Sequence, residues 1–303
     1  MVGGNQMERV RKKKMKQSLG DKTFDFVKNF ILIVLTIACL YPLIYVFSCS
    51  ISSGSAVDSG KVLLFPKDIN FESYKQVLTD KQFWVSYGNT FYYTVFGSLF
   101  SMLVSAPAAY VLSKKRFRAR KVINILLSFT MWFSPGFIPL YLNYSELGVT
   151  NNRFMILISF GIQAFNIILL RNYFESIPEE MEESANVDGS NDFITFVKIY
   201  LPLSKASMAT VWMYYAMSRW NGYFWSTILL KDLKKIPLQV YLKQKIIDQS
   251  LVSEFANTIA GQKYSYNTII YALVACSIVP VLIIYPFIQR FFVKGVMVGG
   301  VKG

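Results

Sequence analysis

Histidine is absent from this chain of 303 residues, which removes the commonest general base and the commonest metal ligand in proteins. Cysteine is nearly absent too: Cys39, Cys49 and Cys276 are scattered through apolar sequence with no C-x-x-C spacing. A disulfide framework and a zinc site are therefore not expected, and no metal ligands are assigned. Charged residues make up only 17% of the chain, against about 25% in a typical soluble domain.

Nucleotide-binding motifs are missing as well. No G-x-x-x-x-G-K-[ST] loop occurs, since the nearest approach, Gly295 to Gly300, is followed by Val301, and no G-x-G-x-x-G occurs. The apolar segments carry no paired carboxylates. We therefore expect a chain that is not an enzyme, with no cofactor of its own.

What the chain has in excess is apolar sequence and positive charge. Hydrophobic residues reach 53%, and the net charge is +14. The basic residues cluster at positions 9–22, before the first apolar run, and at 114–121, between two others. Basic clusters beside hydrophobic spans are typical of cytoplasmic loops of membrane proteins, so nucleic acid is not expected as a partner.

Six segments are long and apolar enough to cross a bilayer, which requires about 20 residues per helix. They lie at about 26–47, 84–112, 122–142, 154–173, 206–230 and 268–293. Pro135, Gly136 and Pro139 interrupt the third segment, which predicts a kink and a helix beside the translocation path. The expected fold is an all-α membrane protein with six spans.

An even number of spans puts both termini on one side, and the two basic clusters indicate that this side is the cytoplasm. The predicted parts are a basic cytoplasmic tail at 1–23, the six-span domain at 24–293 and a cytoplasmic tail at 294–303. A cytoplasmic loop at 174–205 and outer loops at 51–83 and 231–266 complete the membrane domain. The last loop contradicts the charge rule because it is rich in lysine, and its residues 236–247 are expected to form an interfacial helix.

The segment 171–205 is the most informative part of the sequence. Pro178 suits the first position of a helix, and four glutamates follow it where the helix dipole favours negative charge. Gly189 is placed for a C-terminal cap, and Asn191 can cap a second helix that Pro202 would end. The pattern predicts a helix-turn-helix.

The second of these helices is amphipathic. Its apolar face, at i, i+3, i+4 and i+7, is formed by Phe193, Phe196, Val197 and Tyr200. Patterning alone leaves three positions open for this face: on the bilayer, against its own bundle, or in the groove of another protein.

The spacing of this loop resembles a known signature. Glu183-Ser184-Ala185, then Gly189, then Ile199-Tyr200-Leu201-Pro202 is similar to the coupling-loop motif E-A-A-x-x-x-G-x9-I-x-L-P of ABC-importer permeases, with Ser184 in place of alanine as the one departure. Further similarity to the maltose-type second permease subunit of carbohydrate importers lies in Arg171-Asn172-Tyr173-Phe174, Trp220-Asn221 and the ending 292–303. The resemblance runs from about residue 25 to the end, and its tail is most similar to permeases for oligosaccharides and polysaccharides.

The resemblance implies a type I importer bundle in a bacterial inner membrane, whose cytoplasmic coupling helices dock into a separate ATPase. Expected partners are a second permease subunit, an ABC ATPase dimer that carries the ATP and Mg, an extracellular solute-binding protein and membrane lipid. Carried over by position, the ATPase-coupling residues are Glu183, Ser184, Ala185, Asp188, Gly189, Ile199, Leu201 and Pro202. The last three would close the second helix against the bundle.

Polar residues inside membrane spans are costly and indicate a translocation path or contacts between helices. The candidates for the path are Arg219, Trp220, Asn221, Tyr223, Asn89, Gln163 and Asn166. Aromatic faces with hydrogen-bonding groups suit a sugar, but Arg219 can equally pair with a neighbouring helix.

The predicted function is ATP-driven import of an oligosaccharide or polysaccharide through half of a translocation path. Two alternatives stay open: the same architecture could import a peptide or a polyol, or the chain could be an ion-coupled secondary transporter. The latter would typically show titratable groups at mid-membrane and inverted repeats, which are not evident here.

Overall fold

A computed structural model describes residues 19–252 and 264–300, and all regular structure in those residues is helical. The elements in chain order are α1 (Leu19–Ser50), α2 (Gly54–Asp58), α3 (Glu72–Thr79), α4 (Lys81–Ser113), α5 (Arg120–Trp132), α6 (Phe137–Glu146), α7 (Arg153–Ser159), α8 (Ala164–Glu175), α9 (Glu179–Val187), α10 (Asp192–Thr195), the π-helix η1 (Phe196–Tyr200), α11 (Leu201–Leu203), α12 (Lys205–Trp220), α13 (Phe224–Leu229), α14 (Leu238–Val252) and α15 (Tyr266–Gly300). The prediction of an all-α protein is confirmed for this part of the chain.

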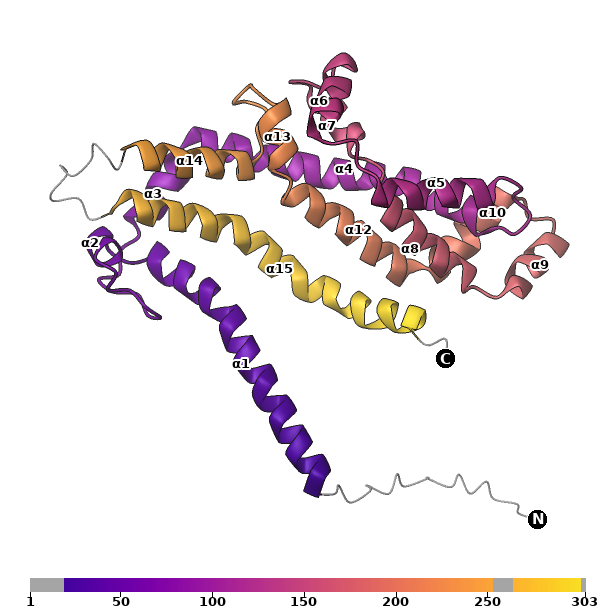
Figure 1. Cartoon of the computed structure of the whole chain (residues 1–303), viewed down its shortest axis with the longest axis horizontal. Helices are drawn as coiled ribbons and strands as arrows, with labels where there is room; N and C mark the ends of the chain where they lie inside the picture. Colours follow the sequence, from indigo (N-terminus) through magenta and orange to yellow (C-terminus); the bar gives the residue numbers. More distant parts are fainter. Residues whose placement is uncertain (1–18, 253–263, 301–303) are drawn as a thin grey trace, which may run out of the picture.

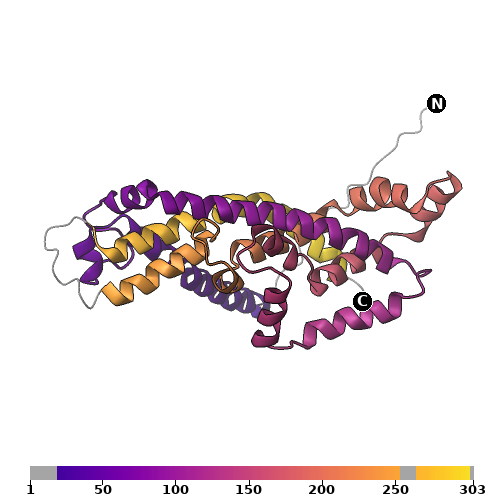
Figure 2. The ribbon, with the colours of Figure 1, turned by 90° about the horizontal axis from the view of Figure 1, so that it is seen from above.

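Of the long helices, α4 is the most deeply buried, and it runs along the length of the molecule (Figure 2). It packs against α12, α8 and α14. Its inward positions include small side chains, Ser98, Ser101, Ser105, Ala106 and Ala109, all buried. Small residues let helix backbones approach closely, which is how helices pack in a bilayer that offers no hydrophobic gain between them.

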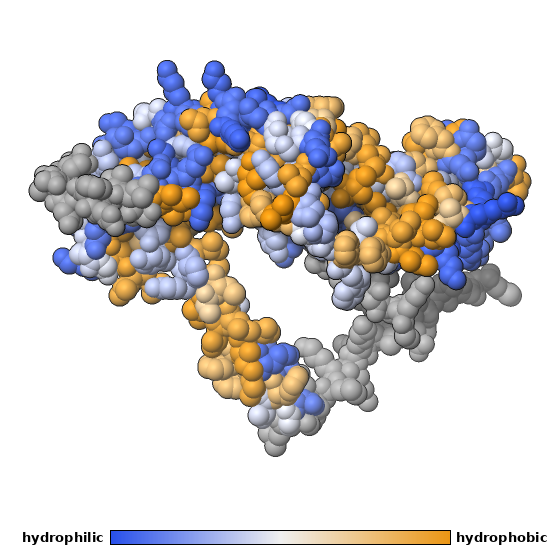
Figure 3. Space-filling view, turned by 45° about the horizontal axis from the view of Figure 1, so that its top comes forward, coloured by the Kyte–Doolittle hydropathy of each residue, from blue (hydrophilic) through white to orange (hydrophobic). Residues whose placement is uncertain are grey.

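The first helix leaves the bundle. Figure 1 shows α1 diverging from the other helices below α2, where its later end meets α15. None of its most apolar window is buried, and Figure 3 shows it as a largely hydrophobic rod. A helix of 32 residues with such a surface is stable only against lipid or another membrane chain.

Two of the expected spans are broken. The bend that Pro135 and Gly136 predict in the third is confirmed in position and is sharper than a kink, because α5 and α6 meet at 117° across residues 133–136, where Gly136 has φ +89°. The fourth bends by 50° between α7 and α8. Within the described residues, three helices can span a membrane by themselves, and up to five spans result if each bent pair counts as one. The six-span topology therefore stays a prediction.

The fifth expected segment is also interrupted. It divides into α12 and α13 at a turn formed by Asn221, Gly222 and Tyr223. The sixth expected segment is contained in α15, which continues to Gly300. Residues 294–300 of the predicted tail therefore belong to a helix. Residues 1–18 of the basic tail and 301–303 lie outside the described residues.

The predicted interfacial helix at 236–247 proves to be part of the bundle. The observed helix α14 packs on α4 and α15, and Leu238, Val240 and Tyr241 are buried in its contacts. Apolar residues recur at the same spacing in an interfacial helix and in a helix packed in a bundle. The contacts of α14 with α4 and α15 are therefore needed to tell the two apart. Lys231, Lys234 and Lys243 nevertheless remain exposed, while Lys263 lies outside the described residues.

The segment 51–83 forms a small helical cap that is tied to the start of α15. Ser73 donates a hydrogen bond to Thr268 over 2.7 Å, and Asp58 accepts bonds from Ser265 and Asn267. Gly54 of α2 touches the same segment, since a Cβ there would lie 2.4 Å from the backbone nitrogen of Ser265.

We expect Gly54→Ala to destabilise the protein by about 1–3 kcal/mol, because the new methyl group would force two backbone segments apart. The measurement is the thermal unfolding midpoint of the purified protein in detergent. Gly88→Ala is the matched control: Gly88 lies inside α4, and a Cβ there would have no atom within 4 Å, so that alanine should raise stability by about 0.5–1 kcal/mol. Equal midpoints for the two variants would contradict the close contact.

Candidate functional site: the α9–α10 loop

The loop after α8 folds as two short helices joined by a tight turn, as its sequence predicts. Pro178 is the N-cap residue of α9 and so lies one position before the first helical position that the sequence predicts for it. Glu179, Glu180 and Glu182 occupy the first turn of the helix. Gly189 has φ +77°, a left-handed conformation that favours glycine. The side chain of Asn191 accepts a hydrogen bond from the backbone nitrogen of Ile194 over 2.9 Å and so caps α10.

The expectation that Pro202 ends the second helix is wrong. The helical path continues from α10 through η1 and α11, and Ser204 still donates its backbone N–H to Tyr200 over 3.0 Å. The five residues before α11 widen into a π-helix, in which Leu201 N–H bonds to Phe196 O. A wider turn makes room for the proline ring and for the missing N–H, so that the chain passes the proline without stopping.

The apolar face of the second helix divides between two environments. Phe196 is 8% exposed and Tyr200 is buried, both against Tyr110 and Phe174, whereas Phe193 is 73% exposed and Val197 also faces outward. Packing against the protein's own bundle, one of the three environments that the pattern left open, is thus observed for Phe196 and Tyr200. Phe193 and Val197 remain exposed.

The sequence-predicted coupling residues divide in the same way. Glu183, Ser184, Asp188 and Gly189 are exposed, while Ala185 is buried within its own chain. Ile199 and Leu201 pack partly against the bundle, but Pro202 is exposed and closes nothing. The exposed residues of the loop, which include Val187 and Phe193, make up its outer side, and Glu183 among them also lines the cleft beside the end of α4.

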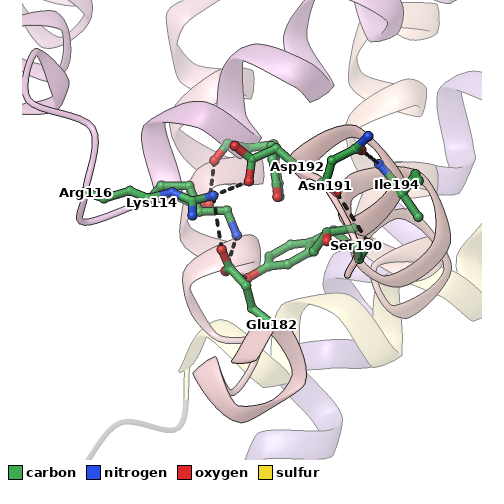
Figure 4. A network of polar contacts seen from close by, with 11 residues as sticks. Lys114, Arg116, Glu182, Ser190, Asn191, Asp192 and Ile194 are labelled. Atoms are coloured by element: carbon green, nitrogen blue, oxygen red, sulfur yellow. Dashed lines mark hydrogen bonds and ion pairs between the residues drawn. The ribbon is translucent and has the colours of Figure 1, made fainter. Parts of the chain in front are cut away.

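Charged side chains bind the inner side of this loop to the end of α4 (Figure 4). Glu182 of α9 pairs with Lys114, the residue that caps α4, over 2.5 Å, and accepts a hydrogen bond from the Tyr200 hydroxyl over 3.0 Å. Arg116 bridges Glu182 and Asp192, which are on the two different helices of the loop. Beside these pairs lies a cleft of about 520 Å³, lined by residues of both segments.

Burial sets the electrostatics of the pair. Loss of water lowers the pKa of Lys114, and Glu182 counteracts only part of this effect. Burial alone would raise the pKa of Glu182, but its bond to Lys114, the Tyr200 hydroxyl and the charge of Arg116 together lower that pKa. The basic cluster at 114–121 and the glutamates after Pro178 are visible in the sequence. Their pairing is not, because 68 residues separate Lys114 from Glu182.

The predicted path residues do not form one site. Asn89 is buried and donates to Lys234 O and Ile236 O, both over 2.9 Å, while Arg153 donates to its side-chain oxygen. Gln163 and Asn166 bond to each other at the break between α7 and α8, and Gln163 also reaches Ser218.

Arg219 lies beside this second group and holds a broken helix. Its guanidinium donates to Ile156 O over 3.1 Å and to Leu157 O over 2.8 Å, carbonyls of the last turn of α7. Gly97 of α4 leaves room for it, since a Cβ there would lie 3.0 Å from the Arg219 Nε atom. Trp220 is buried against Tyr87 and Phe91, whereas Asn221 and Tyr223 are exposed in the turn before α13.

The helical bundle, its apolar surfaces and its two-helix loop define a membrane transport permease. Residues 83–298 match the family model described as binding-protein-dependent transport system inner membrane component, and the chain belongs to this family of multi-pass inner-membrane proteins.

The chain is similar along most of its length to two proteins of Bacillus subtilis, one of which is named as a polysaccharide transport permease. The chain is 35% identical over 284 residues to the polygalacturonan/rhamnogalacturonan transport system permease protein YtcP of Bacillus subtilis, covering 93% of this chain and 99% of that protein. It is 32% identical to protein LplC of the same organism, covering 87% and 90%.

A solved structure agrees with this grouping. A chain in the crystal structure of a bacterial ABC transporter involved in the import of the acidic polysaccharide alginate matches with 49% identity and a TM-score of 0.85, over 91% of this chain and 99% of that one. The fold is therefore that of a type I ABC permease. A second chain, from an alginate transporter in complex with an alginate pentasaccharide-bound periplasmic protein, matches at 16% identity with a TM-score of 0.58 and supports the fold alone.

We expect Arg219→Met to lower the free energy of unfolding by about 1–3 kcal/mol, because two carbonyls at the end of α7 lose their donor inside the bundle. Thermal unfolding in detergent measures the effect. Asn221→Ala, two residues further and exposed, should change stability by less than about 0.5 kcal/mol. Unchanged stability of Arg219→Met with a weakened apparent affinity for the transported solute would contradict this structural role.

Proposed function

We propose that this chain is a permease subunit of an ATP-driven importer, forms half of a translocation path and is driven through the α9–α10 loop. The observation that carries the proposal is the two-sided loop: its inner side is fixed to the bundle by buried charges, and its outer side exposes apolar and acidic groups. Phe193 and Val187 are both exposed on this short, folded loop, and together they offer an apolar surface that a partner's groove could cover.

The partner that fits this outer side is a separate nucleotide-hydrolysing subunit. The chain has no phosphate-binding loop, so that the ATP and its Mg belong to an ATPase dimer. Glu183, Ser184, Asp188 and Gly189 form the exposed knob that would enter a groove of the ATPase, and alternating access follows when the ATPase pair closes and moves this knob. A second permease subunit, which would cover surfaces such as α1, and an external solute-binding protein complete the assembly.

The loop side is then the cytoplasmic side. The basic residues of the α4–α5 link, Arg116, Arg118, Arg120 and Lys121, agree with this orientation, which puts both termini in the cytoplasm. The exposed lysines near α14 would face outward, against the charge rule, but they belong to a packed segment that is fixed by its contacts with α4.

For the substrate we propose an acidic oligosaccharide or polysaccharide. Two relatives support this class, since one is named for polygalacturonan and the other imports alginate. The outward positive charge at Lys231, Lys234 and Arg153 would attract a polyanion on its way to the path. Uptake by the complete importer should favour oligouronates over neutral maltooligosaccharides of equal length, and a preference for the neutral sugars would refute this substrate class.

The loop function is tested at Gly189. A β-branched residue in the left-handed conformation costs about 1–2 kcal/mol and turns α9 relative to α10, so that we expect Gly189→Val to reduce solute uptake at least tenfold and to weaken copurification of the ATPase.

Gly189→Asn is the matched control, because asparagine tolerates this conformation and no other atom lies within 4 Å of its Cβ. It should retain more uptake and more bound ATPase than the valine variant. If Gly189→Val keeps full uptake and a bound ATPase, the proposed coupling is wrong.

A further inference from the structure

The end of α4 carries a charge that is buried to an unusual degree. The side chain of Lys114 is only 9% exposed, and its partner Glu182 is 16% exposed. The Lys114 Nζ atom also lies 4.2 Å from the ring centroid of Tyr110 and 3.8 Å from that of Tyr200. Such partners hold a buried ammonium group in place. If the group moved away from Glu182 or from the two rings, its charge would be left without water and without a partner, which is costly.

Other ion pairs cross the same boundary but differ in kind. Lys115 pairs with Glu179 over 2.5 Å with side chains that are 77% and 66% exposed, so that water screens their attraction. Arg120 pairs with Glu175 at the end of α8. Among the pairs described between the α4–α5 link and the loop helices, only Lys114–Glu182 has both side chains largely buried.

The opposite end of α4 is fixed just as firmly, to the segment before α14. Gln82 donates to Leu233 O, Asn89 to Lys234 O and Ile236 O, and Tyr93 to Lys235 O. Thr90 accepts a bond from the backbone nitrogen of Leu238 over 2.7 Å. Five side-chain to backbone hydrogen bonds therefore seat the segment 233–238 on one helix.

Between its two fixed ends, α4 is one helix of 33 residues, which at about 1.5 Å per residue extends roughly 50 Å. Figure 1 shows the α9–α10 loop beyond one end of α4 and α14 beside the other. Pro107 lies inside α4, but the helix continues past it to Ser113 without a break, whereas the pairs α5–α6 and α7–α8 are bent by 117° and 50°. A helix without a break transmits displacement along its axis.

We propose that Lys114, Glu182 and Tyr200 form a mechanical joint through which the α9–α10 loop moves α4, and with α4 the segment 233–238 on the far side. The inference rests on the proposed function, since it takes the loop to be the part that the ATPase moves. Glu182 is a positioning residue in this scheme: it touches neither solute nor nucleotide, and it determines whether motion of the loop reaches the bundle.

The test uses the complete importer, with its partner permease, ATPase dimer and binding protein, reconstituted in proteoliposomes. Glu182→Gln and Lys114→Met should leave the ATPase bound and hydrolysing ATP at half its rate or more, but reduce uptake at least tenfold. The ATP consumed per solute imported should then rise at least fivefold. The reciprocal exchange, Lys114→Glu with Glu182→Lys, restores a pair of opposite charge and should recover part of the uptake.

Two controls separate this joint from a general need for charge or stability. The exposed pair, changed as Lys115→Gln with Glu179→Gln, should keep both uptake and hydrolysis within twofold of the unaltered importer. Tyr200→Phe removes one hydrogen bond but keeps the ion pair, so that it should fold even if Lys114→Met does not, and should raise the ATP cost per solute by a smaller factor.

A second readout follows motion directly. In a background with the three native cysteines replaced by serine, Lys234→Cys reports on the far end of α4 through its rate of maleimide labelling. Addition of a non-hydrolysable ATP analogue should change this rate in the otherwise unaltered importer and should not change it with Glu182→Gln.

Equal losses of uptake and hydrolysis in the Glu182→Gln importer, or a labelling rate at position 234 that still responds to the analogue, would overturn the joint. This failure differs from a failure of the proposed function. If Gly189→Val releases the ATPase while the joint variants keep normal stoichiometry, only the joint is wrong; if Gly189→Val has no effect, the loop is not the site of coupling.

Discussion

In a bilayer, a backbone N–H or C=O group that leaves its helix has no water to bond, so that every break in a spanning segment must be repaired by the protein itself. The arrangement of this chain follows from that constraint. Arg219 reaches from α12 to the carbonyls at the end of α7, and Gly97 lacks a side chain where the guanidinium passes. Arg219 therefore satisfies backbone carbonyls of a broken helix, and these hydrogen bonds fix α7 against α12.

The same need to satisfy backbone N–H and C=O groups explains the structure of the loop that projects from the bundle. Asn191 caps α10, Gly189 adopts the left-handed conformation at the turn, and the π-helix η1 accommodates Pro202. With its backbone satisfied locally, the loop can expose Phe193 without unravelling. A folded loop that exposes apolar side chains such as Phe193 and Val187 beside acidic groups has a form that a partner's groove can accept.

Charge has two functions at the two ends of α4. At the loop end, the buried pair Lys114–Glu182 holds the loop to α4, whereas the exposed pair Lys115–Glu179 nearby is screened by water and contributes little energy. At the far end, α4 uses neutral amides and hydroxyls to hold the segment 233–238, in which Lys234 is exposed and Lys235 donates a hydrogen bond to Asn151 O. The lysine-rich segment that violates the charge rule is thus anchored by hydrogen bonds made to its backbone.

The sequence by itself determined the class of the protein, the helical content and the local form of the loop. Apolar length, the shortage of charge, the glutamates after Pro178 and a glycine at the turn are local features, and local rules of helix capping and hydropathy suffice to interpret them. The resemblance carried by Glu183, Gly189 and Ile199 led to the family for the same reason, since its spacing lies within one short segment.

Only the tertiary structure decided which residues meet. It separated Phe193 from Phe196, moved the helix near Lys243 from an interface into the bundle, and let the chain pass Pro202. It also dispersed the expected path residues and joined Lys114 to Glu182. These outcomes depend on contacts between segments that are tens of residues apart, where burial and partner geometry outweigh any preference that a single stretch of sequence can express.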